Sequence, residues 1–238
     1  MTAPVLCMEG VDKTFRLHQR GGIELPVLRG ACLVVHPGEC VALDGPSGSG
    51  KSTLLKLIYA NYRATRGSIR VRCEGEAGAA MLEVTTAAPR QLLSMRRTTI
   101  SYVSQFLRAI PRVSTLDVVG EALVDCADGD DQAVRAAQAT VQHLLLRLRI
   151  PARLWQLPPA TFSGGEQQRV NIARGLVEAK PLLLLDEPTA ALDADNSTTV
   201  MQLIVEARER GAAIVGIFHD ARVRDVVATR VVDIAGFR

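Results

Sequence analysis

The sequence predicts an α/β fold in which a core with a parallel sheet carries an antiparallel β subdomain and an inserted helical lobe. A glycine-rich loop at residues 45–53 lies between a short apolar strand and a helix. Residues 181–185 form a continuous apolar run followed by two carboxylates, which is typical of a parallel strand buried on both faces. Residues 68–74 alternate polar and apolar, which instead indicates a half-exposed antiparallel strand. A chain of 238 residues with 47% apolar content suits one large domain with a sizeable core.

Composition and charge argue against several classes of protein. The net charge of +3 comes from 28 basic and 25 acidic residues spread along the chain, so no single-sign block predicts a nucleic-acid partner or a membrane-surface patch. No apolar run approaches the roughly 18 residues that span a bilayer, and the N-terminus has no secretory pattern. We therefore expect no nucleic-acid partner, and we expect any membrane contact to come through another protein.

Cysteine usage predicts a reducing compartment. The five cysteines are an odd number without metal-ligand spacing, and several fall in apolar, strand-like stretches: Cys7, Cys32, Cys40, Cys73 and Cys126. We therefore expect buried, reduced thiols and a cytoplasmic protein.

The N-terminal part of the chain is strand-like. Residues 5–35 fit strands with a break at residues 20–22, whose two glycines predict a hairpin or loop. Phe15 lies just before this break. Its ring could stack on a nucleotide base or pack in the core, and the sequence favours neither alternative.

The loop at residues 45–53 matches G-x-x-x-x-G-K-[ST] at every fixed position; it reads Gly45, Pro46, Ser47, Gly48, Ser49, Gly50, Lys51, Ser52 and Thr53. Glycines permit backbone angles that turn successive N–H groups inward around a phosphate at a helix N-terminus. Lys51 would then reach the β- and γ-phosphates, and Ser52 would ligate Mg²⁺. An ordinary glycine-rich turn is disfavoured because a strand and a helix flank the loop. The expected ligand is a nucleoside triphosphate.

Residues 99–104 predict another strand, and Gln105 stands at its C-terminal end, where α/β sheets place ligand-binding groups. A solvated loop amide is the alternative for Gln105. Beyond it the pattern changes to helix, with an apolar stripe at three- and four-residue spacing over residues 134–148 that serves packing. Three prolines end this pattern, so residues 106–160 are expected to form a mainly helical lobe inserted in the core.

Two further segments suit phosphate chemistry. Ser163, Gly164, Gly165 and Glu166 precede a helical stretch, where Ser163 is a plausible N-cap and exposed N–H groups could hold an anion, although an ordinary cap looks the same. Asp186 and Glu187 end the apolar strand that starts after Pro181. Asp186 would hold Mg²⁺ through water, and Glu187 would orient or deprotonate the attacking water.

A last buried strand at residues 212–218 delivers His219 to its C-terminal end. Most loop histidines have no catalytic part. A contact between His219 and the γ-phosphate is nevertheless favoured, because three other strand ends already converge on one triphosphate site.

The set and order of these motifs resemble the ABC-type ATPases over essentially the full length. The motifs are the phosphate loop, Gln105, the Ser163–Glu166 signature, Asp186 with Glu187, the Ala191-Leu192-Asp193 segment and His219. The resemblance implies ATP and Mg²⁺ as cofactors, with Ser52, Gln105 and Asp186 at the metal. It implies Glu187, His219, Gln105 and Lys51 as catalytic residues, Phe15 at adenine, and Asp193 beside the nucleotide. Glu166 departs from the glutamine most common in the signature.

The resemblance also implies an organisation. Residues 1–238 would form one ABC ATPase domain, with residues 1–105 and 161–238 as the ATP-binding core and β subdomain, and residues 106–160 as the helical lobe. In this family the signature completes the ATP site of a second subunit. We therefore expect a homodimer, or a heterodimer with a related subunit.

Several local segments resemble one branch of the family, the PhnL-type subunits of the bacterial carbon–phosphorus lyase system. They are residues 14–19, 25–28, 59–62, 105–108 with 110–112, and 153–155. This branch implies soluble carbon–phosphorus lyase subunits as partners. It also implies an accessory part in the synthesis of ribose 1-phosphonate 5-triphosphate during phosphonate breakdown.

The alternative is the ATPase subunit of a membrane transporter or lipoprotein-release system, with a membrane permease as partner. The docking surface would separate the two roles. We expect it at residues 106–112 with the inserted lobe, where Arg108 and Arg112 could meet an acidic partner or simply be solvated.

Overall fold

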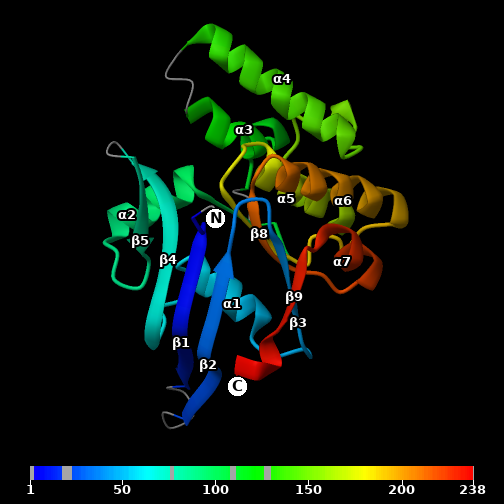
Figure 1. Ribbon diagram of the computed structural model, residues 1–238. Coiled ribbons are helices and arrows are strands. Elements are labelled where there is room, and N and C mark those ends of the chain that lie inside the picture. Colours follow the sequence, from blue (N-terminus) through cyan, green and yellow to red (C-terminus); the bar gives the residue numbers. More distant parts are fainter. Residues whose placement is uncertain (1–2, 18–22, 76–77, 108–110, 126–129, 238) are drawn as a thin grey trace.

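The computed structural model describes residues 3–17, 23–75, 78–107, 111–125 and 130–237. These residues form two sheets with one helix, α1 (Lys51–Ile58), packed between them, and further helices on the far side of the parallel sheet (Figure 1). The predicted α/β class with an antiparallel subdomain is therefore confirmed.

The first sheet is antiparallel, with the strand order β2-β1-β4-β5. Its strands are β1 (Leu6–Leu17), β2 (Ile23–Val35), β4 (Arg66–Gly75) and β5 (Gly78–Glu83). The strand predicted at residues 68–74 is β4, and its alternation places Ile69 and Val71 in the core beneath the sheet. The break predicted at residues 20–22 lies outside the described residues.

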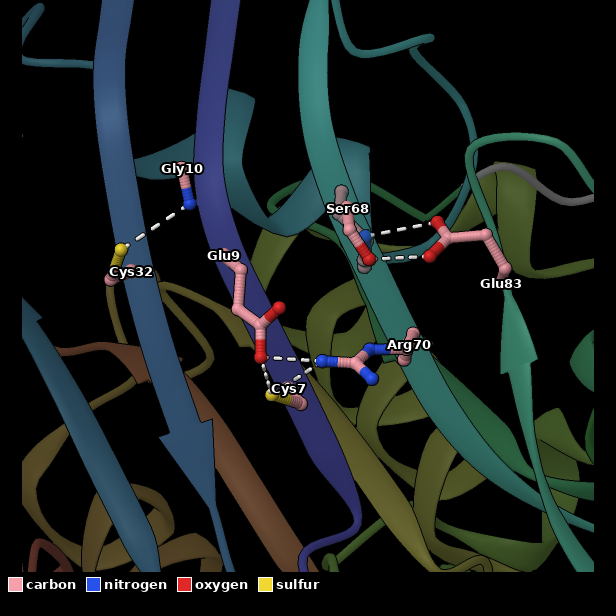
Figure 2. Close-up of polar contacts among 8 residues, drawn as sticks. Cys7, Glu9, Gly10, Cys32, Ser68, Arg70 and Glu83 are labelled. Carbon is pink, nitrogen blue, oxygen red and sulfur yellow. Dashed lines mark hydrogen bonds and ion pairs between the residues drawn. The ribbon is translucent and has the colours of Figure 1, made fainter.

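The outer face of this sheet carries polar side chains (Figure 2). Arg70 of β4 forms an ion pair with Glu9 of β1 and contacts the Cys7 sulfur, while Ser68 donates to Glu83 of β5. Cys32 of β2 is exposed on this face and accepts a hydrogen bond from the Gly10 N–H.

This placement corrects the prediction that the cysteines are buried. Of the four described cysteines only Cys40 is buried, because strand alternation turns Cys7 and Cys32 outward. All four are free thiols, as predicted, and Cys126 lies outside the described residues.

The second sheet is parallel, with the order β6-β7-β8-β3-β9. Its strands are β3 (Cys40–Asp44), β6 (Ile100–Val103), β7 (Leu182–Asp186), β8 (Ala213–Ile217) and β9 (Arg230–Asp233). Alternate residues of each inner strand face two different cores. In β7, Leu182 and Leu184 face α1 and the antiparallel sheet, whereas Leu183 and Leu185 face the other helices. Burial on both faces explains why this strand is a continuous apolar run.

The remaining helices are α2 (Pro89–Thr98), α3 (Thr115–Asp125), α4 (Asp131–Arg147), α5 (Gly164–Leu176), α6 (Ala194–Glu209) and α7 (Ala221–Val227). Short 3-10 turns lie at Ala152–Leu154, Pro159–Thr161 and Ile234–Phe237. Helices α3 and α4 pack on each other and on α5, at the top of the view in Figure 1. Within the described residues no helix is both long enough and apolar enough to cross a bilayer.

Two ion pairs join this helical region to α6. Arg147 at the end of α4 donates to both carboxylate oxygens of Glu206, at 2.9 and 2.6 Å, and Arg149 lies 2.9 Å from Asp195. These contacts connect the α4 end to both ends of α6.

Candidate nucleotide site at the carboxyl edge of the parallel sheet

The predicted phosphate loop connects β3 to α1 at the carboxyl edge of the parallel sheet. Gly50 is the N-cap of α1 with a φ of 102°, and a Cβ there would lie 2.9 Å from a Val27 methyl carbon of β2. Only glycine fits this left-handed turn and close approach. The Lys51 ammonium donates to the Gly45 and Pro46 carbonyl oxygens, at 2.6 and 3.0 Å. The Lys51 side chain therefore reaches back to the first two residues of the phosphate loop.

Ser52 and Asp186 lie side by side, although 134 residues separate them. The Ser52 hydroxyl donates to Asp186 Oδ1 at 3.0 Å, and the Tyr102 hydroxyl donates to Oδ2 at 3.0 Å. Asp186 is 4% exposed. Burial raises the pKa of the Asp186 carboxyl, and the two hydroxyl hydrogen bonds oppose the rise. Tyr102 was not singled out from the sequence; its place on β6, next to β7, is the only signal that could have found it.

These oxygen atoms fit a magnesium ion. In the described ranges no group of three His, Cys, Asp or Glu side chains could hold a metal without other ligands. Mg²⁺ in nucleotide sites is usually held by one or two protein oxygens, phosphates and water. A serine hydroxyl and a carboxylate beside a phosphate loop supply such a donor set.

Glu187 follows Asp186 and lies between the other two predicted strand-end residues. Gln105 Nε2 donates to Glu187 Oε2 at 3.2 Å, and His219 Nε2 lies 2.8 Å from Glu187 Oε1. The ends of β6, β7 and β8 therefore bring these three side chains together, as predicted. Glu187 has a φ of 53°, a conformation that costs a non-glycine residue roughly 1–3 kcal/mol. The turn leaves the side chain 19% exposed, so a water molecule can reach the carboxylate.

The signature segment forms a separate cluster. Ser163 is the N-cap of α5 and forms a capping box with Glu166, which confirms the predicted cap. The hydrogen bonds from Ser163 hold the pKa of the Glu166 carboxyl below its usual value. In the described part of the chain, no hydrogen bond or ion pair of Ser163 or Glu166 reaches the phosphate loop or Glu187.

Asp193 lies near this cluster but serves its own helix. It is the N-cap of α6 and accepts hydrogen bonds from the Asn196 N–H and side-chain amide, at 2.8 and 2.9 Å. The Asn196 N–H holds the pKa of the Asp193 carboxyl below its usual value. Ala191, two residues before Asp193, lies close to the start of α5: a Cβ added at Gly165 would be 3.1 Å from the Ala191 carbonyl oxygen.

Phe15 belongs to a cluster of aromatic and basic side chains. Its ring meets Tyr62 edge to face at a centroid distance of 5.2 Å, and the Lys13 ammonium lies 4.5 Å from the Phe15 centroid. Lys13 also donates to the Arg63 carbonyl oxygen at 2.8 Å. Phe15 is half-buried, so packing occupies only part of its surface and a base could still contact the rest. Neither Lys13 nor Tyr62 was predicted to lie beside Phe15, although Tyr62 belongs to the segment 59–62 that resembles one branch of the family.

Comparison with known proteins identifies the family. Residues 28–190 match the family model described as ABC transporter. This chain belongs to the ABC transporter family. The matched range includes the phosphate loop, the signature and Asp186 with Glu187, so the chain is an ABC ATPase domain, of the kind that binds ATP with Mg²⁺ and hydrolyses it.

Full-length similarity to ABC ATP-binding proteins supports this assignment. The chain is 38% identical to the lipoprotein-releasing system ATP-binding protein LolD 2 of Caulobacter vibrioides, over 92% of this chain and 90% of that protein. It is 35% identical to the macrolide export ATP-binding/permease protein MacB of Nitrobacter winogradskyi, over 94% of this chain but only 32% of MacB. The chain therefore spans about a third of the MacB length.

Solved structures agree with the sequence comparison. A dimeric post-hydrolysis state of the ATP-binding cassette MJ0796, bound to ADP and Pi, superposes with a TM-score of 0.83 at 29% identity and covers 96% of this chain and 93% of its own. The expected ABC nucleotide-binding fold is thereby confirmed.

Proposed function

We propose that this chain hydrolyses ATP as one half of a dimer and that dimer closure drives a partner protein. The observation that carries the proposal is the convergence of Gln105, Glu187 and His219 beside the Ser52–Asp186 pair. Lys51 and the loop N–H groups bind the phosphates, while Ser52 and Asp186 hold Mg²⁺, which withdraws charge from the phosphate oxygens.

In this proposal Glu187 accepts the proton of the attacking water. Gln105 and His219 hold its two carboxylate oxygens in place, and His219 also contacts the γ-phosphate. Phe15 supports the adenine base. The left-handed turn at Glu187 supports the assignment, because strained residues cluster at active sites.

The second subunit supplies the other half of the site. Ser163, Gly164 and Gly165 present a helix N-terminus to the γ-phosphate of the partner, with Glu166 and Asp193 beside it. The dimeric form of MJ0796 supports this arrangement. The lobe of residues 106–160 carries α3 and α4, which pack on α5, so movement of the lobe would carry the signature. Residues 1–105 and 161–238 act as the core.

For the driven partner, we favour a membrane permease of an export or lipoprotein-release system. The relatives named for lipoprotein release and macrolide export support it, and two of them resemble this chain over at least 90% of its length. The expected docking surface at residues 106–112 can be followed only in part, since Arg108 lies outside the described residues.

A second candidate partner is the soluble carbon–phosphorus lyase machinery, with an accessory role in making ribose 1-phosphonate 5-triphosphate. It is favoured by the local segments that resemble PhnL-type subunits, among them residues 59–62 and residues 105–108 with 110–112. Residues 59–62 include Tyr62, whose ring meets the Phe15 ring edge to face. If Phe15 supports the adenine base as proposed, this part of the resemblance concerns base binding and not a docking surface.

One experiment separates the partners. Tagged Glu187→Gln protein should bind ATP, hydrolyse little of it and remain a closed dimer, because hydrolysis is what opens the interface. It is purified with ATP and Mg²⁺ from detergent-solubilised cells grown on a phosphonate as sole phosphorus source. Lys51→Ala, which loses productive phosphate contact, is the matched control.

Recovery of an integral membrane permease by Glu187→Gln, but not by Lys51→Ala, supports the transport proposal. Recovery of soluble carbon–phosphorus lyase subunits instead overturns it and supports the second candidate. Equal ATP turnover by Glu187→Gln and the parent removes Glu187 from its catalytic role.

A further inference from the structure

The signature serine has its hydroxyl proton committed within its own subunit. The Ser163 hydroxyl donates to Glu166 Oε2 at 2.7 Å, and the Ser163 N–H donates to the same oxygen at 3.0 Å. In return the Glu166 N–H points at Ser163 Oγ, at 3.4 Å. A serine hydroxyl has one proton to donate, so Ser163 cannot keep this bond and also donate to a phosphate oxygen.

The carboxylate also occupies the place where an incoming phosphate would be attracted. Glu166 is the third residue of α5, and an acidic group in the first turn offsets the positive end of the helix dipole. The approach to this helix end is open, because Ser163 is exposed and a Cβ added at Gly164 would meet no atom within 4 Å. The carboxylate therefore competes for an end of the helix that is otherwise accessible.

We propose that Glu166 is a positioning residue that weakens ATP-driven dimerisation, because its carboxylate competes with the partner's γ-phosphate for the only proton of Ser163. The inference rests on the proposed function, in which Ser163–Gly165 complete the site of a second subunit. Closing the dimer then requires the Ser163 hydroxyl to turn from Glu166 to the phosphate.

Replacing Glu166 with glutamine removes the negative charge and keeps the shape of the side chain. A glutamine side chain has the same length and completes the same capping box through its amide oxygen. It is neutral, and hydrogen bonds to a charged acceptor are roughly twice as strong as those to a neutral one. Glu166→Gln should therefore keep the fold of the α5 start while releasing the Ser163 hydroxyl more easily. The hydrogen bonds from Ser163 hold the pKa of Glu166 below its usual value, so the carboxylate is charged at neutral pH.

The test measures dimer formation against ATP concentration, with Mg²⁺ and in the Glu187→Gln background, by light scattering after gel filtration. Adding Glu166→Gln should lower the ATP concentration for half-maximal dimerisation at least roughly fivefold. The matched control is Glu209→Gln, which removes the same charge from the exposed C-terminal end of α6. It should leave the curve unchanged.

A double-mutant cycle isolates the hydroxyl. In a Ser163→Ala background there is no hydroxyl proton for Glu166 and the phosphate to compete for. Glu166→Gln should therefore lower the ATP concentration for half-maximal dimerisation clearly less than it does when Ser163 is present. An equal gain in the two backgrounds overturns the proposal, as does a Glu166→Gln curve no better than its parent. If the Glu187→Gln protein does not dimerise with ATP at all, it is the proposed function that fails.

Discussion

Side chains outside the nucleotide-binding motifs surround the Phe15 ring. Lys13 is the clearest case, because its ammonium lies within 6 Å of both the Phe15 and Tyr62 rings and is tied to the Arg63 carbonyl oxygen. Burial of the amine among these groups lowers the pKa of Lys13. Phe15 is thus held in one orientation by neighbours that have no nucleotide-binding motif.

Replacing Lys13 should therefore weaken nucleotide binding without touching the chemistry. Lys13→Met keeps the apolar stem but loses the cation–π contacts and the hydrogen bond to Arg63. We expect the KM for ATP to rise roughly threefold to tenfold with kcat nearly unchanged, since the lost contact is worth about 1 kcal/mol and is made to the Phe15 ring. Arg16→Met, an exposed cation on the same strand, is the control. A fall in kcat with an unchanged KM would show that Lys13 does not serve base binding.

At the scale of elements, close packing of α5 on β6 sets where the signature lies. A Cβ at Gly175 would lie 2.3 Å from a Val103 methyl carbon, so the helix approaches the strand more closely than any other residue allows. Helix propensity alone predicts that Gly175→Ala stabilises the protein by roughly 0.5–1 kcal/mol. We expect the opposite sign, a loss of about 1–3 kcal/mol from overpacking. Urea unfolding followed by circular dichroism decides between the two, and a raised midpoint would contradict the packing argument.

The contact between α4 and α6 should give stability a measurable pH dependence. Hydrogen bonds from Arg147 hold the pKa of Glu206 below its usual value. The folded state therefore prefers the charged carboxylate. This contribution is complete above the unfolded pKa, near 4.5, and is lost as the pH falls through the lowered folded value.

Glu206→Gln should remove that dependence. At pH 7 the variant should be less stable than the parent by up to about 1 kcal/mol, because the pair is half-exposed and screened. The difference should shrink as the pH falls below about 4.5. Urea midpoints measured from pH 7 to pH 3 test this, and a constant difference would mean that the carboxylate charge has no part in joining the lobe to α6.

For the molecule as a whole, the sequence predicted what short periodicity and local motifs encode. The strand at residues 182–186 was readable because burial on both faces leaves it wholly apolar. The meeting of Gln105, Glu187 and His219 followed from the rule that parallel strands share a carboxyl edge. Contacts between side chains on different helices or strands could not be predicted from the sequence. Tyr102 reaches Asp186 only because β6 pairs with β7, and Cys32 is exposed because the alternation of β2 turns it away from the core.

The proposed composite site makes a prediction that only a dimer can satisfy. Lys51→Ala spoils the phosphate loop and leaves the signature intact, whereas Ser163→Arg does the reverse by placing a bulky side chain at the α5 start. Each variant alone should lose nearly all ATPase activity. In an equimolar mixture, half of the dimers are mixed and each contains one intact site, so roughly a quarter of the parent activity should return. The ATPase activities of the two variants measured separately provide the baseline for the activity of the mixture. A mixture as inactive as its components would mean that each ATP site lies within one chain or that the chain pairs only with a different subunit. Adding a purified candidate subunit to the unmodified chain would then separate these two cases, because only heterodimer formation would raise the turnover.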